Sequence, residues 1–181
     1  SMVYLFLAEG FEEAEALIPV DLLRRASVPV TTVGIGGKVI CGTHGIPVTA
    51  DIADKDLPAD LSDLEMIVLP GGMPGTKNLD ASTVVDAALE LAISKNSYIA
   101  AICAAPMILG KRGLLRSKQA VCYPGFEKDL AGATLAPGGV AEDGHIITAK
   151  AAGYAIDFAL ALIRALRGAD AAEQVREAIC P

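Results

Sequence analysis

The sequence predicts one α/β domain whose central sheet is mostly parallel. Three observations lead to this prediction: short apolar runs alternate with helical segments, the runs lack apolar–polar alternation, and no repeat or linker divides the 181 residues. Continuous apolar strands separated by helices are typical of a parallel sheet covered on both faces. A chain of this length buries roughly 70% of its unfolded surface without disulfides or a structural metal. We therefore expect a single domain over residues 2–181, with Ser1 a cloning remnant.

The N-terminal half predicts three strands, a hairpin and two helices. Residues 3–8 (VYLFLA) predict the first strand, and residues 11–26 predict a helix because their apolar side chains recur at helical spacing. Pro19 falls inside that helix and predicts a kink or a late start. The elements expected next are a strand at 28–35, a hairpin or excursion at 36–51, a strand at 66–72 that runs into a glycine turn, and a helix at 81–95 capped by Ser82 or Thr83.

The C-terminal half continues the alternation. The expected elements are a strand at 98–102 followed by a helix, short strands at 119–126 and 145–150, a long amphipathic helix at 153–168 that stops at Gly168, and a shorter final helix. In open α/β sheets, sites lie beyond the carboxyl ends of the strands. Three features follow predicted strands: AEGFEEAE after the first, PGGMPG after the third, and Cys103 after the fourth. We expect these features to lie close together.

Composition and charge exclude several function classes. A net charge of −7 argues against a nucleic-acid partner. The four cysteines form no CxxC pair and no zinc spacing with His44 or His145, so we expect no metal and no cofactor. We expect no leader segment, and no apolar run reaches the roughly 18 residues that a membrane span needs. The expected setting is the reduced cytoplasm, without a membrane partner.

Cys103 is the first candidate functional residue, because it stands where a buried strand gives way to a helix. A tight strand-to-helix turn presents its side chain above the sheet, as the nucleophile elbow of hydrolases does for serine. Unpaired N–H groups at a helix start also stabilise a thiolate. The alternative is an inert buried thiol, which is the common state of a free cysteine. Position alone leaves the two open for Cys103, whereas the inert state is favoured for Cys41, Cys122 and Cys180.

Two nearby segments supply candidate partner groups. Gly71 and Gly72 permit close backbone approach and positive φ, so their N–H groups either line an oxyanion or oxidised-sulfur site or form an ordinary turn. Most carboxylates of the acidic cluster at residues 9–15 are expected to be solvated partners of the helix dipole. Glu15, which lies between two alanines, is the one expected to point inward. An apolar pocket raises the pKa of such a carboxyl, which then donates a hydrogen bond to a thiolate.

Four segments together resemble a known family. They are LAEGFEEAEALIPVDLLRRA, VLPGGMPGTKNL, AAICAAPMIL and TAKAAGYAIDFALALI, which follow one another in this order over nearly the whole chain. The sequence is similar to the ThiJ/PfpI superfamily and resembles most its DJ-1 branch, named for a parkinsonism-associated deglycase. The resemblance implies a flavodoxin-like three-layer sandwich with a nucleophile-elbow cysteine. It also implies a homodimer.

The resemblance implies a role for several residues of the site. Cys103 matches the elbow cysteine, and Glu15 matches a protonated glutamate that contacts it. Gly72 and Ala104 match the positions whose backbone N–H groups line the thiol pocket. The further candidate substrate contacts are Gly71, Tyr123, His44 and Arg25, the last matching an arginine at an anion-binding mouth near the dimer interface. For His44 a plain turn histidine is the favoured alternative.

The sequence also departs from the family pattern. Ala104 replaces the histidine that follows the cysteine in the protease and glyoxalase III-type branches, so a cysteine protease would lack its base. Tyr123 stands where the DJ-1 branch has histidine, and Ala151-Ala152-Gly153 stand in place of a Gly-Pro-Gly turn.

Two functions follow from the resemblance. The first is a cofactor-free glyoxalase- or deglycase-type enzyme acting on reactive dicarbonyls such as methylglyoxal or their protein adducts, with Cys103 adding to the aldehyde and Glu15 moving a proton. The second is a non-enzymatic oxidative-stress sensor or redox-regulated chaperone that uses the same cysteine. Both functions need the same residues, so the sequence does not separate them.

Overall fold

A seven-stranded sheet forms the centre of the computed structural model, which describes residues 1–180. The strand order is β10-β11-β7-β6-β1-β2-β5. Its strands are β1 (Met2–Leu7), β2 (Val30–Gly34), β5 (Ile52–Ala53), β6 (Leu64–Leu69), β7 (Tyr98–Ile102), β10 (Val140–Asp143) and β11 (Ile146–Ala149). Neighbouring strands are parallel, except that β10 runs antiparallel to β11. The mostly parallel sheet is confirmed.

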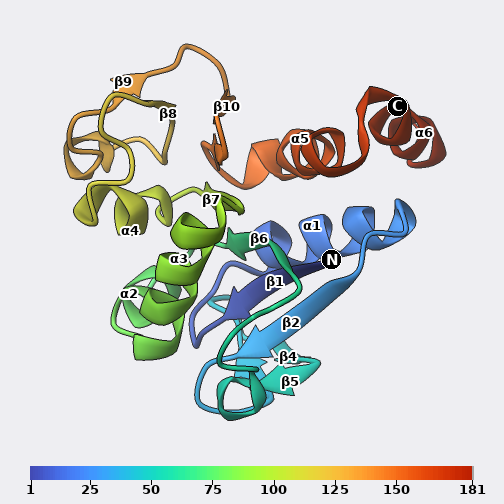
Figure 1. The fold of residues 1–181 in the computed structure, drawn as a ribbon, viewed down its shortest axis with the longest axis vertical. Coiled ribbons are helices and arrows are strands. Elements are labelled where there is room, and N and C mark those ends of the chain that lie inside the picture. The colour runs from blue at the N-terminus through green and yellow to red at the C-terminus, as the bar shows by residue number, and fades with distance from the viewer. Residues whose placement is uncertain (181) are drawn as a thin grey trace.

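Helices cover both faces of the sheet (Figure 1). On one face lie α1 (Glu13–Arg25) and α5 (Ala155–Arg167), with α6 (Ala169–Ala178) packed against α5; on the other lie α2 (Gly75–Asp80), α3 (Thr83–Lys95) and α4 (Pro106–Lys111). Side chains of β1 alternate between the two cores: Leu5 packs into the first and Phe6 into the second. Both faces of the strands are therefore buried, which explains their continuous apolar runs. The result is the expected flavodoxin-like three-layer sandwich.

The smaller elements lie outside the central sheet. The strands β3 (Val39–Cys41) and β4 (Pro47–Thr49) pair as an antiparallel hairpin, as predicted. The strands β8 (Gln119–Ala120) and β9 (Thr134–Leu135) form a separate small sheet. The strand predicted at 119–126 is therefore shorter than expected and absent from the central sheet. Beyond β8, the Val121 N–H donates to the side-chain hydroxyl of Thr148 in β11, at 3.0 Å, and not to a backbone carbonyl of that strand.

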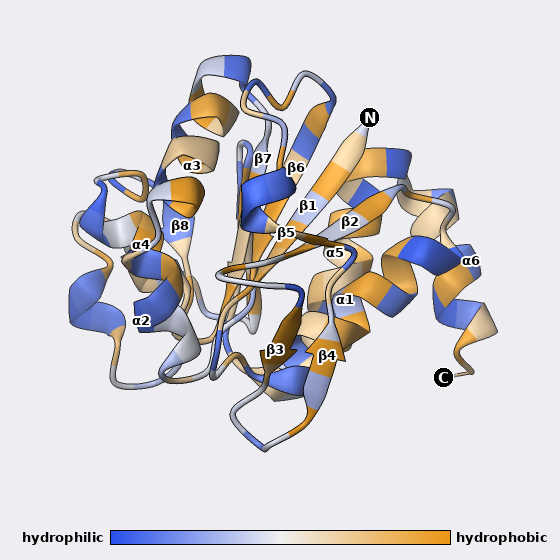
Figure 2. Cartoon of the chain, turned by 90° about the horizontal axis from the view of Figure 1, so that it is seen from below, coloured by the Kyte–Doolittle hydropathy of each residue, from blue (hydrophilic) through white to orange (hydrophobic). Residues whose placement is uncertain are grey.

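The helix boundaries follow local signals in most places. The helix α1 runs unbroken across Pro19, so a late start at that proline is wrong. Ser82 caps α3 by accepting a hydrogen bond from the Val85 N–H at 3.2 Å, as predicted. The helix α5 ends before Gly168, whose φ of 94° is a conformation that glycine adopts readily. Figure 2 shows hydrophobic and hydrophilic residues alternating around the helices.

Within residues 1–180, no helix combines the length and the apolar character needed to cross a bilayer.

Candidate active site

Three segments meet at the carboxyl edge of the central sheet. The strands β7, β6 and β1 are adjacent and parallel, so the loops that follow them emerge side by side. Two hydrogen bonds join the segments after β1 and β6: the Glu12 N–H donates to the Gly71 carbonyl at 2.9 Å, and the Gly71 N–H donates to the side-chain Oε1 of Glu15 at 3.0 Å. Gly71 also lies directly against Cys103. The structure thus brings together the acidic segment, the glycine turn and Cys103.

Cys103 occupies a strained turn directly after β7. Its φ is 68°, a left-handed conformation that is uncommon for a residue other than glycine. Two hydrogen bonds hold it there: the Cys103 N–H donates to the Ala149 carbonyl at 2.9 Å, and the Cys103 carbonyl accepts from the Tyr123 N–H at 2.8 Å. Pro106, with its fixed φ, then begins α4. The turn presents a half-buried thiol at the edge of the sheet, which is the geometry of a nucleophile elbow.

The Glu15 side chain does not make the hydrogen bond that is usual at its position in the helix. A glutamate three residues after the N-cap commonly reaches back to the N-cap N–H. Here the N-cap is Glu12, and its N–H is already bound to the Gly71 carbonyl. The Glu12 carboxylate in turn accepts the Glu15 N–H at 2.9 Å. The Glu15 side chain is therefore free to turn inward, where it is only 1% exposed.

Both glycines of the turn after β6 are required by space or conformation. A Cβ at Gly71 would lie 2.6 Å from Glu15 Oε1 and 2.7 Å from the Cys103 Cβ. At Gly72 the φ is +90°, and a Cβ would lie 2.5 Å from the Glu12 nitrogen. Only glycine allows this backbone to approach the thiol and the carboxyl so closely.

The electrostatics of Cys103 and Glu15 are coupled. Burial raises the pKa of Glu15 to about 7, the charge of Glu12 acts in the same direction, and hydrogen bonds from Cys103 and the Gly71 N–H oppose it. Burial and the negative charge of ionised Glu15 raise the pKa of the Cys103 thiol to about 12, against the N–H groups of Ala104 and Gly72. The turn alone therefore does not make the thiol acidic, contrary to the expectation for an elbow cysteine. Each group resists ionisation while the other is charged, so the two titrate as one unit.

Two further candidate substrate contacts, Tyr123 and Arg25, have different positions relative to the thiol. Tyr123 borders the site through its N–H, and its side chain is 46% exposed, edge-on to Phe126. Arg25 is not brought to the thiol within this chain. It lies ten residues after Glu15 on the same helix, about 15 Å along the axis at 1.5 Å per residue, and pairs with Asp21 at 3.2 Å.

His44 joins a second cluster beside the site. Its exposed ring places Nδ1 at 3.1 Å from Glu13 Oε1 and 3.4 Å from Glu12 Oε1. Glu13 is buried and also accepts the N–H groups of His44, at 2.9 Å, and Ile46, at 3.2 Å. Burial opposes ionisation of Glu13, but these bonds outweigh it and lower its pKa. Although the three side chains are close enough to share a metal ion, the Glu13 oxygens already hold the β3–β4 hairpin against α1.

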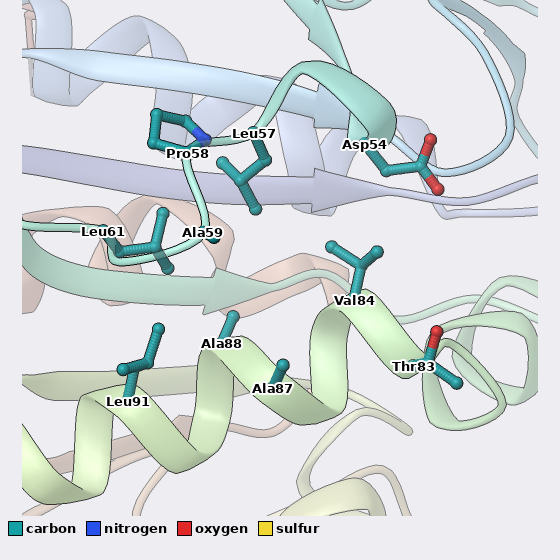
Figure 3. A pocket seen from close by; sticks show the side chains of 10 residues that line it. All are labelled: Asp54, Leu57, Pro58, Ala59, Leu61, Thr83, Val84, Ala87, Ala88 and Leu91. Atoms are coloured by element: carbon teal, nitrogen blue, oxygen red, sulfur yellow. The ribbon is translucent and has the colours of Figure 1, made fainter.

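An apolar cavity of about 280 Å³ lies elsewhere, between α3 and residues 54–61 (Figure 3). Side chains of Val84, Ala88 and Leu91 point from α3 toward Leu57 and the chain around it. The cavity shares no residue with the thiol site.

Sequence reasoning missed the part that Glu12 plays. Glutamate is not among the residue types that cap helices best, so nothing in the sequence marked it as the N-cap of α1. The one available signal was its spacing of three residues before Glu15, which places the two on one helix face.

A strained elbow cysteine, a buried carboxyl beside it and backbone donors around the sulfur define an α/β protein with a thiol-centred site. The family model described as the DJ-1/PfpI family matches residues 1–165. The chain belongs to this family.

The chain is similar over its whole length to proteins of several organisms. It is 35% identical over 175 residues to the Parkinson disease protein 7 homolog of Danio rerio, covering 94% of this chain and 92% of that protein. It is 27% identical over 181 residues to a glutathione-independent glyoxalase of Caenorhabditis elegans, covering 99% and 96%. The solved structure of oxidised Toxoplasma gondii DJ-1 matches with a TM-score of 0.93 and 30% identity, covering 98% and 97%.

Proposed function

We propose that this protein is a cofactor-free enzyme that converts reactive dicarbonyls such as methylglyoxal, free or as protein adducts, through a Cys103 thiohemiacetal. The observation that carries the proposal is the pairing of an elbow thiol with a buried carboxyl that shares its proton. A relative named for glutathione-independent glyoxalase activity supports the reaction class.

The reactive form is a thiolate beside a protonated Glu15. Near neutral pH the pair loses one proton more easily than two, because the second negative charge would face the first in a buried site. A thiolate at Cys103 would accept the N–H groups of Gly72 and Ala104, which favour the charged sulfur, and would face the hydroxyl of a protonated Glu15. A negative charge on the Glu15 carboxylate would meet only the Gly71 N–H and the thiol. The proposal requires that this larger set of donors outweigh the burial and the Glu15 charge that raise the pKa of the thiol while Glu15 is ionised.

The reaction then needs only this pair and water. The thiolate forms a C–S bond to the aldehyde carbon, the carbonyl electron pair moves to oxygen, and Glu15 gives that oxygen its proton. Ionised Glu15 next takes the proton from the former aldehyde carbon, which leaves an enediolate with its negative charge on the ketone oxygen. Glu15 returns this proton to the neighbouring carbon, and the hydroxyl proton on the sulfur-bearing carbon passes to the ketone oxygen as the thioester carbonyl forms. The product is a lactate thioester of Cys103. Hydrolysis of the thioester by water releases lactate and returns the thiol, so no electron acceptor is required.

Lactate formation from methylglyoxal tests this proposal. Cys103→Ser should abolish turnover, and Glu15→Gln should lower it by about 10²- to 10⁴-fold, because the amide does not carry a proton between the two carbons. Cys41→Ser and Glu9→Gln are matched controls and should retain turnover. Equal turnover in Cys103→Ser and in the unmodified protein would contradict the proposal. Proteolysis of a denatured substrate is not expected, because Ala104 provides no base.

A second function uses the same thiol without turnover. The donors around the sulfur also suit the oxygens of an oxidised cysteine, and the matching Toxoplasma gondii structure is described as oxidized. Attack of the thiolate on a peroxide gives a sulfenic acid and hydroxide, and a second peroxide gives the sulfinate and water. A gain of two oxygens on Cys103 together with no lactate formation would favour this sensor function over the enzyme.

The expected homodimer stays a prediction. Three exposed apolar side chains, Leu17 of α1, Val39 of β3 and Ile46 of the hairpin turn, lie on neighbouring elements, and Figure 2 shows β3 as hydrophobic. Light scattering after size-exclusion chromatography measures the assembly directly. A mass of one chain at micromolar concentration would contradict a stable dimer.

A further inference from the structure

Glu12 lies where the start of α1, the glycine turn after β6 and the β3–β4 hairpin meet. Its Oε2 accepts the Glu15 N–H at 2.9 Å, and its own N–H donates to the Gly71 carbonyl at 2.9 Å. Its Oε1 lies 3.4 Å from Nδ1 of His44 in the β3–β4 hairpin. The side chain is only 18% exposed. Its carboxylate is therefore held in one place, one helical turn before Glu15.

The choice of glutamate at this N-cap needs a reason other than capping. Aspartate, asparagine and serine cap helices better, and any of them would satisfy the Glu15 N–H. Residues three apart on a helix face each other, and like charges at that spacing repel. Glutamate at position 12 therefore places a fixed negative charge where it acts on Glu15.

We propose that Glu12 is a positioning residue for the thiol pair: its carboxylate, bound to the Glu15 amide, disfavours a second negative charge on Glu15 and so keeps the shared proton there. The negative charge of the pair then stays on the Cys103 sulfur. This inference rests on the thiolate and carboxylic acid state proposed above.

The other acidic groups near Glu15 form contacts with the β3–β4 hairpin. Glu9, in the loop after β1, accepts the Cys41 N–H at 3.0 Å on the exposed surface. The Glu13 carboxylate accepts hydrogen bonds from two N–H groups of the hairpin and contacts the His44 ring. Burial is the largest cause of the raised pKa of Glu15, and the negative charge of Glu12 adds to it, in agreement with the geometry. Protonated His44 would oppose Glu12, so the hairpin acts on the same balance.

The test removes the charge and keeps the hydrogen bond. In Glu12→Gln, the amide oxygen still accepts the Glu15 N–H. Carboxyl ¹³C NMR should show the Glu15 titration midpoint falling by about half a unit to one unit. Alkylation of Cys103 by iodoacetamide at pH 7 should slow by about three- to tenfold, because the proton moves back to sulfur. The melting temperature should stay the same, since the cap remains.

A matched control and a second variant make the result decisive. Glu9→Gln removes an equal charge from the same loop and should leave the Glu15 midpoint and the alkylation rate unchanged. His44→Lys places a fixed positive charge beside Glu12 without touching the cap, and should lower the midpoint in the same direction.

The inference is overturned if the Glu15 midpoint is unchanged in both Glu12→Gln and His44→Lys, or if Glu9→Gln shifts it equally. If Glu12→Gln does not fold, His44→Lys alone decides. The NMR titration requires no turnover, so a protein that makes no lactate but shows these shifts would refute the enzymatic proposal and leave the role of Glu12 intact.

Discussion

At the scale of single residues, Cys103 combines a strained backbone with a half-buried thiol beside an acidic side chain. A φ of 68° costs on the order of 1–3 kcal/mol for a residue other than glycine, and the hydrogen bonds to Ala149 and Tyr123 hold the turn against that cost. Glu15 adds a second unfavourable feature, because a buried carboxyl resists ionisation. Strain and burial at one position are typical of a site selected for reactivity instead of stability.

Because of Glu15, the free energy of unfolding should decrease as the pH rises. Its pKa is about 7 in the folded protein, above the ordinary value of 4.5 that applies when the chain is unfolded. Below 4.5 both states hold the proton; between 4.5 and 7 only the folded state does, so the free energy of unfolding drops by up to about 3 kcal/mol. Glu15→Gln lacks this loss and should become more stable relative to the unmodified protein over that interval. Urea unfolding at pH 4.5 and pH 7 measures the difference.

Glu13→Gln serves as the opposite control. The pKa of Glu13 is lowered, so its contribution to stability is present above the unfolded value and is lost as the pH falls. This variant should lose stability at pH 7 and little at acid pH. Parallel pH curves for the unmodified protein and Glu15→Gln would refute the assignment of a raised pKa to Glu15.

At the scale of elements, the loop after β6 holds the two reactive groups at contact distance. A methyl group at Gly71 has no free space between Glu15 and Cys103. Gly71→Ala should therefore displace both side chains, destabilise the fold by about 1–3 kcal/mol, and abolish dicarbonyl turnover. Gly37→Ala is the matched control, because a Cβ there meets no atom within 4 Å. Unchanged turnover in Gly71→Ala would show that the observed spacing is not needed.

Arg112 joins the three helices of one face. Its guanidinium lies 2.6 Å from Asp80 at the end of α2 and 3.1 Å from Asp86 in α3. Arg112→Met should lower the free energy of unfolding by about 1–3 kcal/mol, because it removes the donor that lies 2.6 Å from the partly buried Asp80 carboxylate and the hydrogen bond to the Ile108 carbonyl. Arg176→Met, at an exposed pair on α6, should change it by less than about 0.5 kcal/mol. Chemical denaturation of both variants checks the contrast, and equal effects would contradict it.

The sequence predicted the elements whose signals are local or repeated. Continuous apolar runs predicted β1 and β7, and helical spacing of apolar residues predicted α3 and α5. The rule that parallel strands share one carboxyl edge predicted that residues 9–15, the glycine turn and Cys103 would meet. The short helix α2 and the antiparallel strand β10 were not predicted, because six and four residues carry too little periodicity. The place of Glu15 depended on a hydrogen bond between Glu12 and Gly71, distant in sequence, which no local pattern reports.

At the scale of the whole molecule, the sandwich supports the site from the two packed cores beneath it. Two cores hold the faces of β1, β6 and β7, so the loops that follow these strands share a fixed base. The thiol, the carboxyl and the backbone donors all stand on that base. The proposed chemistry therefore depends on two groups, Cys103 and Glu15, that stand on one fixed base.

The most direct test is the pH dependence of Cys103 alkylation by iodoacetamide, resolved from the other three cysteines by peptide mass spectrometry. If the pair places its negative charge on sulfur, the midpoint should lie below the ordinary thiol value of about 8.5. A midpoint near 12, or no labelling of the folded protein, would mean that Glu15 ionises first and leaves the thiol protonated. That result would contradict both the thiolate mechanism and the role assigned to the shared proton.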